Sequence, residues 1–264
     1  MDRLRIASCV AAVLVPLLVA PAFAGVNLRW DQCFSDGGVQ NKTFACDTNT
    51  GSERLVMSFV LDTDMQQVSG NEIILKIQSA SATLPSWWSL KSAGTCRQAS
   101  LGFSSSVPAG AVNCLDWGGG AESGGIGAYS IGFSGPNTVR VSMAVAVPPT
   151  NLSDLVANQE YFSGALTINH AKTVGTGACS GCDQPVCIAI EQLTVTTPVL
   201  ASNIVVAGGA SAPNSEFARW QNSVETNVTF ECHVMSGCTH TFTCADASTP
   251  TRSSTWGAVK ALYR

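Results

Sequence analysis

The sequence carries little charge. Asp, Glu, Lys and Arg make up 12% of the 264 residues, aromatic residues 7%, and there are three histidines. The formal net charge is −4, and lysines and arginines form no block anywhere in the chain. Nucleic acids and anionic membrane surfaces attract basic patches, so neither is expected to be a partner of this chain.

Long apolar runs are missing after the N-terminus. Arg3 and Arg5 precede an apolar stretch over residues 6–19, and Ala22-Phe23-Ala24 supplies a small-x-small cleavage site. This order is typical of a secretory signal peptide, and the stretch is short and broken by proline for a membrane span. We expect residues 1–24 to be removed and the mature chain to be secreted or held at the cell surface without a transmembrane segment; an uncleaved anchor is the alternative.

Many short runs of alternating or continuous apolar residues indicate an all-β fold. Residues 139–147 alternate most clearly, with four valines and one methionine on one side and Arg140, Ser142, Ala144 and Ala146 on the other. Residues 55–61, 73–77, 161–169, 186–195 and 228–232 are further candidate strands. Their spacing predicts a disulfide-stapled antiparallel β-sandwich, Ig-like or jelly-roll-like, in which 55–61 and 73–77 form a hairpin or a crossover between sheets.

The composition divides the mature chain. "VVAGGASAPNS" reads as a linker or long loop, which predicts a sandwich over 25–198 and a small, irregular, cysteine-bearing segment over 199–264. "GGGAESGGIG", residues 118–127, is predicted to be a mobile loop. Short helical turns are predicted in "PSWWSLKSAG" and "NLSDLVANQ", and a short helix in the final "STWGAVKALYR".

Whether the chain has a redox or metal site depends on the role of its cysteines. Removing Cys9 with the signal leaves ten: Cys33, Cys46, Cys96, Cys114, Cys179, Cys182, Cys187, Cys232, Cys238 and Cys244. A redox role for Cys179 and Cys182 would need a helix N-terminus, but loop residues flank the pair. A zinc site with His170, His233 or His240 fits no known ligand spacing. An even number in an exported chain favours disulfides, and we expect no metal and no cofactor.

The cysteine spacing also suggests a pairing. Cys33 with Cys46, and Cys96 with Cys114, are the nearest local pairs. The other six form two triplets, 179/182/187 and 232/238/244. Each triplet is odd in number, so complete oxidation requires at least one bridge between them and ties the C-terminal segment to the sandwich. The sequence does not choose among the 15 connectivities of six cysteines.

Trp87, Trp88 and Trp117 are the candidate binding residues. On an extended chain, adjacent tryptophans point to opposite faces, so at least one of the first two could be exposed as a stacking platform for a sugar or a protein. The competing interpretation places one indole in the core and the other under a loop, and it fits how often aromatic residues are buried.

Other motifs are weaker. The stretch 47–53, "DTNTGSE", begins like a calcium loop but departs from the EF-hand pattern, and a turn is the better interpretation. Asp62 and Asp64 are scattered acids rather than a glycosidase pair. "AYSIG" around Ser130 lacks the strand–turn–helix context of a nucleophile elbow. Asn41, Asn151 and Asn227 begin glycosylation sequons.

Several stretches resemble a group of uncharacterised secreted bacterial proteins: "NKTFACDTNTGS", "SASATLPSWW", "AGTCRQ", "NHAKTVGTGACSGC" with "PVCI", and "STWGAVKALYR". The resemblance covers most of the mature chain and implies an exported bacterial protein of similar design. The resemblance implies no particular activity, cofactor or functional site. The shared ending implies a packing element or a short sorting or attachment signal.

These observations predict a secreted or cell-surface structural or binding protein without catalytic activity of its own, with an extracellular glycan or another surface protein as its partner. A carbohydrate-binding module is the alternative, and a secreted hydrolase is the third hypothesis. A hydrolase would gather two acids, or a histidine and a serine, in one pocket. A sugar binder would expose tryptophan on a flat or grooved face.

Overall fold

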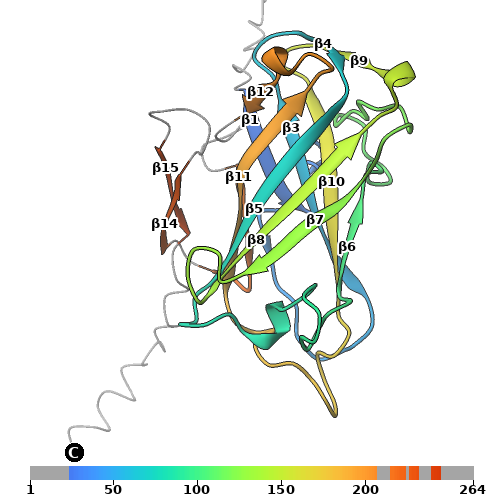
Figure 1. The fold of residues 1–264 in the computed structure, drawn as a ribbon. Helices are drawn as coiled ribbons and strands as arrows, with labels where there is room; N and C mark the ends of the chain where they lie inside the picture. The colour runs from blue at the N-terminus through green and yellow to red at the C-terminus, as the bar shows by residue number, and fades with distance from the viewer. Residues whose placement is uncertain (1–23, 207–214, 224–225, 232–238, 245–264) are drawn as a thin grey trace, which may run out of the picture.

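The structure is a computed structural model that describes residues 24–206, 215–223, 226–231 and 239–244, the last two ranges for their backbone only. Within these ranges the chain is nearly all strand, with four short 3-10 turns and no α-helix. Two sheets face each other, and all their strand pairs are antiparallel except the two-residue pairing of β2 with β13 (Figure 1). The predicted all-β, antiparallel sandwich is therefore confirmed.

The smaller sheet has the order β1-β3-β10-β6 and the larger one β2-β13-β11-β5-β8-β7, with β12 also paired to β11. The strands of the smaller sheet are β1 (Gly25–Trp30), β3 (Ser52–Val60), β10 (Glu160–Asn169) and β6 (Leu101–Ser104). Those of the larger sheet are β2 (Asn41–Lys42), β13 (Phe217–Trp220), β11 (Val186–Thr196), β5 (Gly70–Ser79), β8 (Thr138–Ala146), β7 (Ser123–Ile131) and β12 (Ile204–Val206).

Two small ribbons and the 3-10 turns complete the described chain. β4 (Met65–Val68) pairs with β9 (Ser153–Leu155), and β14 (Thr226–Glu231) pairs with β15 (Thr239–Cys244). The turns are η1 (Phe34–Asp36), η2 (Ser86–Trp88), η3 (Pro149–Asn151) and η4 (Leu200–Ser202). No helix of the described residues has the length and apolar character that a bilayer span requires.

The alternation in residues 139–147 is confirmed. The four valines and Met143 face the core, whereas Arg140, Ser142, Ala144 and Ala146 face outward. β3 and β5 belong to different sheets, so the segment between them is a crossover and not a hairpin. The register of β8 with its neighbouring strands thus follows from the rule that one face of each strand is buried.

Three local predictions need correction. β12 and β13 lie beyond residue 198 and complete the larger sheet, so the predicted domain boundary there is too early. Part of the predicted glycine-rich loop 118–127 is strand, because β7 begins at Ser123 and pairs with β8. Residues 151–159 form the end of η3 and β9 instead of two helical turns. The helix predicted at the C-terminus falls outside the described residues.

Three disulfides join segments that are distant in sequence. Cys33 bonds Cys114, Cys46 bonds Cys182 and Cys96 bonds Cys179. Both predicted local pairs, Cys33–Cys46 and Cys96–Cys114, are therefore wrong. The bridges close loops of 81, 136 and 83 residues and connect loops at the ends of strands, where the sandwich brings remote segments together.

Cys187 is also disulfide-bonded, and its partner is a cysteine other than these six. Its position opposite Gln78 in β5 places it on the outer face of the larger sheet. The pairing of Cys232, Cys238 and Cys244 lies outside the described side chains. The bridge between the two cysteine triplets therefore stays a prediction.

Candidate functional site

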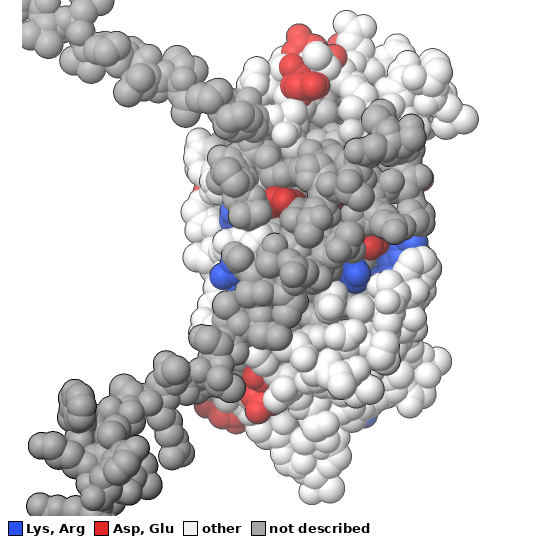
Figure 2. Space-filling view, turned by 90° about the vertical axis from the view of Figure 1, so that its left-hand side faces the viewer, with Lys and Arg blue, Asp and Glu red and all other residues white. Residues whose placement is uncertain are grey.

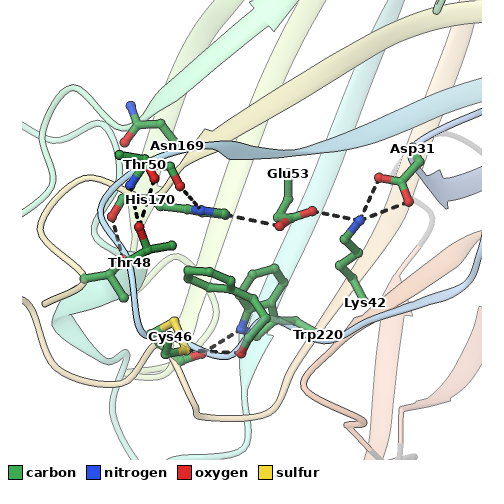
Figure 3. Close-up of polar contacts among 12 residues, drawn as sticks. Asp31, Lys42, Cys46, Thr48, Thr50, Glu53, Asn169, His170 and Trp220 are labelled. Carbon is green, nitrogen blue, oxygen red and sulfur yellow. Dashed lines mark hydrogen bonds and ion pairs between the residues drawn. A yellow bond between two sulfur atoms is a disulfide. The ribbon is translucent and has the colours of Figure 1, made fainter.

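A chain of four charged or ionisable side chains runs from the surface into one end of the sandwich (Figure 3). Asp31 follows β1, Lys42 lies in β2, Glu53 in β3, and His170 follows β10. Lys42 Nζ lies 2.8 Å from Asp31 Oδ1 and 2.8 Å from Glu53 Oε2. The other oxygen of Glu53 is 3.1 Å from His170 Nε2. Three successive segments near the start of the described chain and the distant end of β10 are thus joined by side-chain contacts.

His170 is held on all sides. Its Nδ1 lies 2.8 Å from the Thr50 carbonyl oxygen, and Phe44 stacks on the ring at a centroid distance of 3.8 Å. A Cβ atom at Gly51, where φ is +93°, would stand 3.2 Å from Nδ1, so glycine there allows the close approach. Only 5% of His170 is exposed. The ring is packed as part of the fold.

The chemistry open to this cluster is limited. Both ring nitrogens of His170 face acceptor oxygens, one on Thr50 and one on Glu53, so neither presents a free lone pair to a substrate. Burial opposes the charge on Lys42, but its hydrogen bonds with Asp31 and Glu53 outweigh burial and raise the pKa of its ammonium. These contacts connect parts of the fold and therefore have a structural role.

The three predicted binding tryptophans are in the interior. Trp87 and Trp88 are fully buried and Trp117 is 5% exposed, so none of them is a stacking platform at the surface. The prediction failed because it assumed an extended chain, whereas both neighbours lie in η2 and turn inward. Trp87 Nε1 donates to Thr173 Oγ1 at 3.0 Å. The competing interpretation, core and loop packing, describes these residues.

Arg97 is a buried residue that the sequence did not single out. Its guanidinium lies 3.6 Å from the centroid of the Trp87 ring and donates to the carbonyl oxygens of Trp87 and Asn169. Desolvation lowers the pKa of Arg97 to about 10. The sequence around Arg97 shows no pattern that would predict a buried arginine, because the residues that contact its guanidinium come from η2 and the end of β10.

Among the described residues, one group of potential metal ligands lies close together: Cys33, Cys114 and Glu160. The two sulfurs are bonded to each other and so are not available as thiolates. Glu160 accepts hydrogen bonds from Asn27, Ser58 and the backbone amides of Phe34 and Ser35. These residues do not fit a metal ion.

The neighbouring Asp36 supports a pH-dependent prediction. Burial disfavours its charge, but hydrogen bonds from the backbone of residues 112–114 and the Asn113 side chain outweigh burial and hold its pKa below the ordinary 3.8. A carboxyl whose pKa falls on folding stabilises the fold above its unfolded pKa, and this contribution disappears as pH falls through the folded pKa. We expect Asp36→Asn to lower the unfolding midpoint in denaturant at pH 7, and we expect the difference from wild type to shrink progressively as pH falls below the ordinary 3.8. A difference that stays constant from pH 7 down through this range would contradict the expectation.

The remaining motifs lie apart from one another. Asn49 of the calcium-like stretch accepts hydrogen bonds from the backbone amides of Thr173 and Val174, and these bonds connect two loops. Ser130 lies inside β7, so the elbow geometry is absent there. Asp64 accepts a hydrogen bond from the Ala157 backbone. Within the described chain, these side chains do not combine into a nucleophile–base pair or a paired-acid pocket.

The open surface lies elsewhere, on the outer face of the larger sheet. An open hollow of about 550 Å³ crosses β5, β8 and β7. It forms because the outward residues of three adjacent strands are mostly small, and its lining includes Glu72, Ile74, Gly125, Gly127, Ser142 and Ala144. On a second face, drawn in Figure 2, the described atoms are mostly uncharged, and acidic and basic side chains form small separate groups.

Comparison with known proteins adds nothing to this geometry. No protein-family model, curated protein or solved structure matches the chain. Its function must therefore be argued from the described residues.

Proposed function

We propose that the chain is a secreted or cell-surface structural or binding protein without catalytic activity of its own, and that the outer face of β5, β8 and β7 is its binding surface. The cleavable signal predicted for residues 1–24 and the disulfides support export, because disulfides persist in oxidising compartments. An extracellular glycan or a surface protein is the expected ligand.

One contrast carries the proposal. The described groups that could act chemically, His170 and the paired cysteines, are buried or partly buried and already bonded, whereas the hollow is open and lined mostly by small side chains. Pockets with a few polar groups among apolar ones bind ligands by shape and orientation. Glu72 and Ser142 supply the polar groups here, and Ile74 with Ala144 the apolar contact.

A pair of variants on one strand tests the surface. Ala144 lines the hollow, and Ala146 lies two residues further along the same face of β8 but outside the hollow; both are exposed. We expect the purified protein to bind a component of a glycan array or isolated cell envelopes. Ala144→Arg, which fills the hollow, should weaken that binding at least about tenfold, while Ala146→Arg, the matched control, should leave it unchanged.

Two results would contradict the proposal. Equal binding by wild type and Ala144→Arg would remove the hollow as the site. Hydrolysis of glycoside or ester substrates by the purified protein, with rates proportional to its concentration, would show catalytic activity. Thermal melts of both arginine variants should match wild type, because both positions are on the surface.

A further inference from the structure

One end of the hollow on the larger sheet is bordered by charged side chains. Arg140 in β8 is the outward residue next to Ser142, which lines the hollow. Arg140 Nε lies 3.4 Å from Glu191 Oε2 in β11, so the two side chains meet above β5, the strand between β8 and β11. Lys76 of β5 pairs with Arg140 in the same row. These long side chains stand beside the small residues of the hollow and border it at this end.

An exposed aromatic ring lies at the same end. Phe133 is in the turn between β7 and β8, and Arg140 Cζ lies over its ring, 4.5 Å from the centroid. The guanidinium holds one face of the ring in place, yet 56% of Phe133 is exposed. Among the described residues, no other aromatic side chain is as open to solvent. Such a ring can stack on a sugar, whose C–H groups form an apolar face.

The opposite end of the hollow has the reverse hydrogen-bonding character. Glu72 is exposed there, opposite Ala144 and four residues along β5 from Lys76. Four residues of a strand span about 13 Å. The guanidinium of Arg140 only donates hydrogen bonds, whereas a carboxylate such as that of Glu72 only accepts them. A ligand that reaches both ends must therefore both donate and accept.

A neutral oligosaccharide meets these conditions. Each sugar hydroxyl both donates and accepts hydrogen bonds, so one kind of group suits both ends. A polyanionic chain across the hollow would bring a charge close to Glu72, and a polycationic chain would bring one close to Arg140; like charges in contact repel. The distance between the two ends exceeds one sugar ring. The volume of about 550 Å³ lies within the range of ligand-binding sites.

A peptide strand suits the hollow less well. Peptides that join a sheet gain affinity from backbone groups that have no partner strand. β5 lies between β11 and β8, and β8 lies between β5 and β7, so both strands under the hollow are paired along both sides. Sugar binding needs no backbone partner, because it uses side chains and an aromatic face.

We propose that the hollow binds a neutral oligosaccharide, with Phe133 stacking on a sugar ring at the Arg140 end and Glu72 accepting hydrogen bonds from hydroxyls at the other. This inference rests on the binding surface proposed above and names its ligand. Arg140 has two roles in it: its guanidinium holds the Phe133 ring and faces the sugar as a donor. Ser142 and Ala144 form the floor on which the sugar lies.

Substitutions of Phe133 test the stacking by isothermal titration calorimetry with a neutral oligosaccharide that binds on a glycan array. We expect Phe133→Ala and Phe133→Leu each to weaken binding at least about tenfold, and Phe133→Trp to bind at least as tightly as wild type. Ile131→Ala is the matched control and should leave binding unchanged. Ile131 is exposed in the same hairpin, but it pairs with the core-facing Val139 and so lies on the other face of the sheet.

The array tests the class of ligand. We expect neutral oligosaccharides to bind at least about tenfold more tightly than uronic-acid or amino-sugar oligosaccharides. Tighter binding of a charged glycan, or unchanged affinity in Phe133→Ala, would overturn this inference. Binding to cell envelopes that Ala144→Arg weakens, without binding to any glycan on the array, would also overturn it, but it would leave the proposed binding surface standing with a protein as ligand. No binding to glycans or envelopes would contradict both proposals.

Discussion

Replacing Trp220 with alanine should destabilise the protein by about 3–5 kcal/mol, the range for loss of a large buried aromatic side chain. Trp220 is fully buried at the centre of an aromatic cluster. Its ring centroid lies 5.3 Å from that of Trp87 and 5.7 Å from those of Trp30 and Trp88. Its Nε1 donates to the Cys182 carbonyl oxygen at 2.7 Å. Denaturant unfolding followed by tryptophan fluorescence and by circular dichroism measures the change.

Two further substitutions serve as comparisons for the effect of Trp220→Ala on stability. Trp220→Phe keeps an aromatic ring but removes the shorter of the two hydrogen bonds to the Cys182 carbonyl oxygen, the longer one coming from Gln221 Nε2, and it should destabilise less than alanine. Leu200→Ala removes a side chain that is 82% exposed and should change stability by no more than about 0.5 kcal/mol. A Trp220→Ala variant within 1 kcal/mol of wild type would mean that the cluster does not hold this end of the sandwich.

Removing the Cys46–Cys182 bridge should have an effect of similar size. The bridge closes a loop of 136 residues, and the chain-entropy relation gives about 5 kcal/mol for its restraint of the unfolded chain. We expect Cys46→Ala with Cys182→Ala to lower the free energy of unfolding by that order. Both residues are replaced together so that no free thiol remains to exchange with the other bridges.

The Cys33–Cys114 bridge is the matched comparison. It closes 81 residues, for which the same relation gives about 4.5 kcal/mol, so the two double variants should be destabilised to nearly the same extent. Unfolding curves of both variants at one pH provide the comparison. Wild-type stability in the Cys46/Cys182 double variant would show that the bridge adds no restraint beyond native packing.

The strands were predictable because burial imposes a period of two on the sequence. β8 shows this most clearly, since its alternating residues face the core and the surface in turn. β7 was missed because glycine has no side chain with which to show the period, although it pairs with β8 along its length. This edge strand of the larger sheet was thus hidden by its own composition.

Pairing between remote residues was not predictable from spacing. Cys46 and Cys182 meet because the topology brings their loops to the same end of the sandwich, and nothing in the local sequence of either encodes the other. The same holds for Glu53 and His170, 117 residues apart, whose contact depends on the pairing of β3 with β10. Local pattern predicts elements, whereas the fold decides which side chains meet.

The long span of the Cys46–Cys182 bridge has a consequence for proteolysis. A single cut anywhere between the two cysteines produces two fragments that stay joined by sulfur. Both fragments contribute strands to the larger sheet, β2 from one and β11 and β13 from the other, and both contribute tryptophans to the aromatic cluster, Trp30 and Trp220. The bridge therefore keeps the parts of a cleaved molecule together. Such a molecule stays covalently whole after its first cleavage.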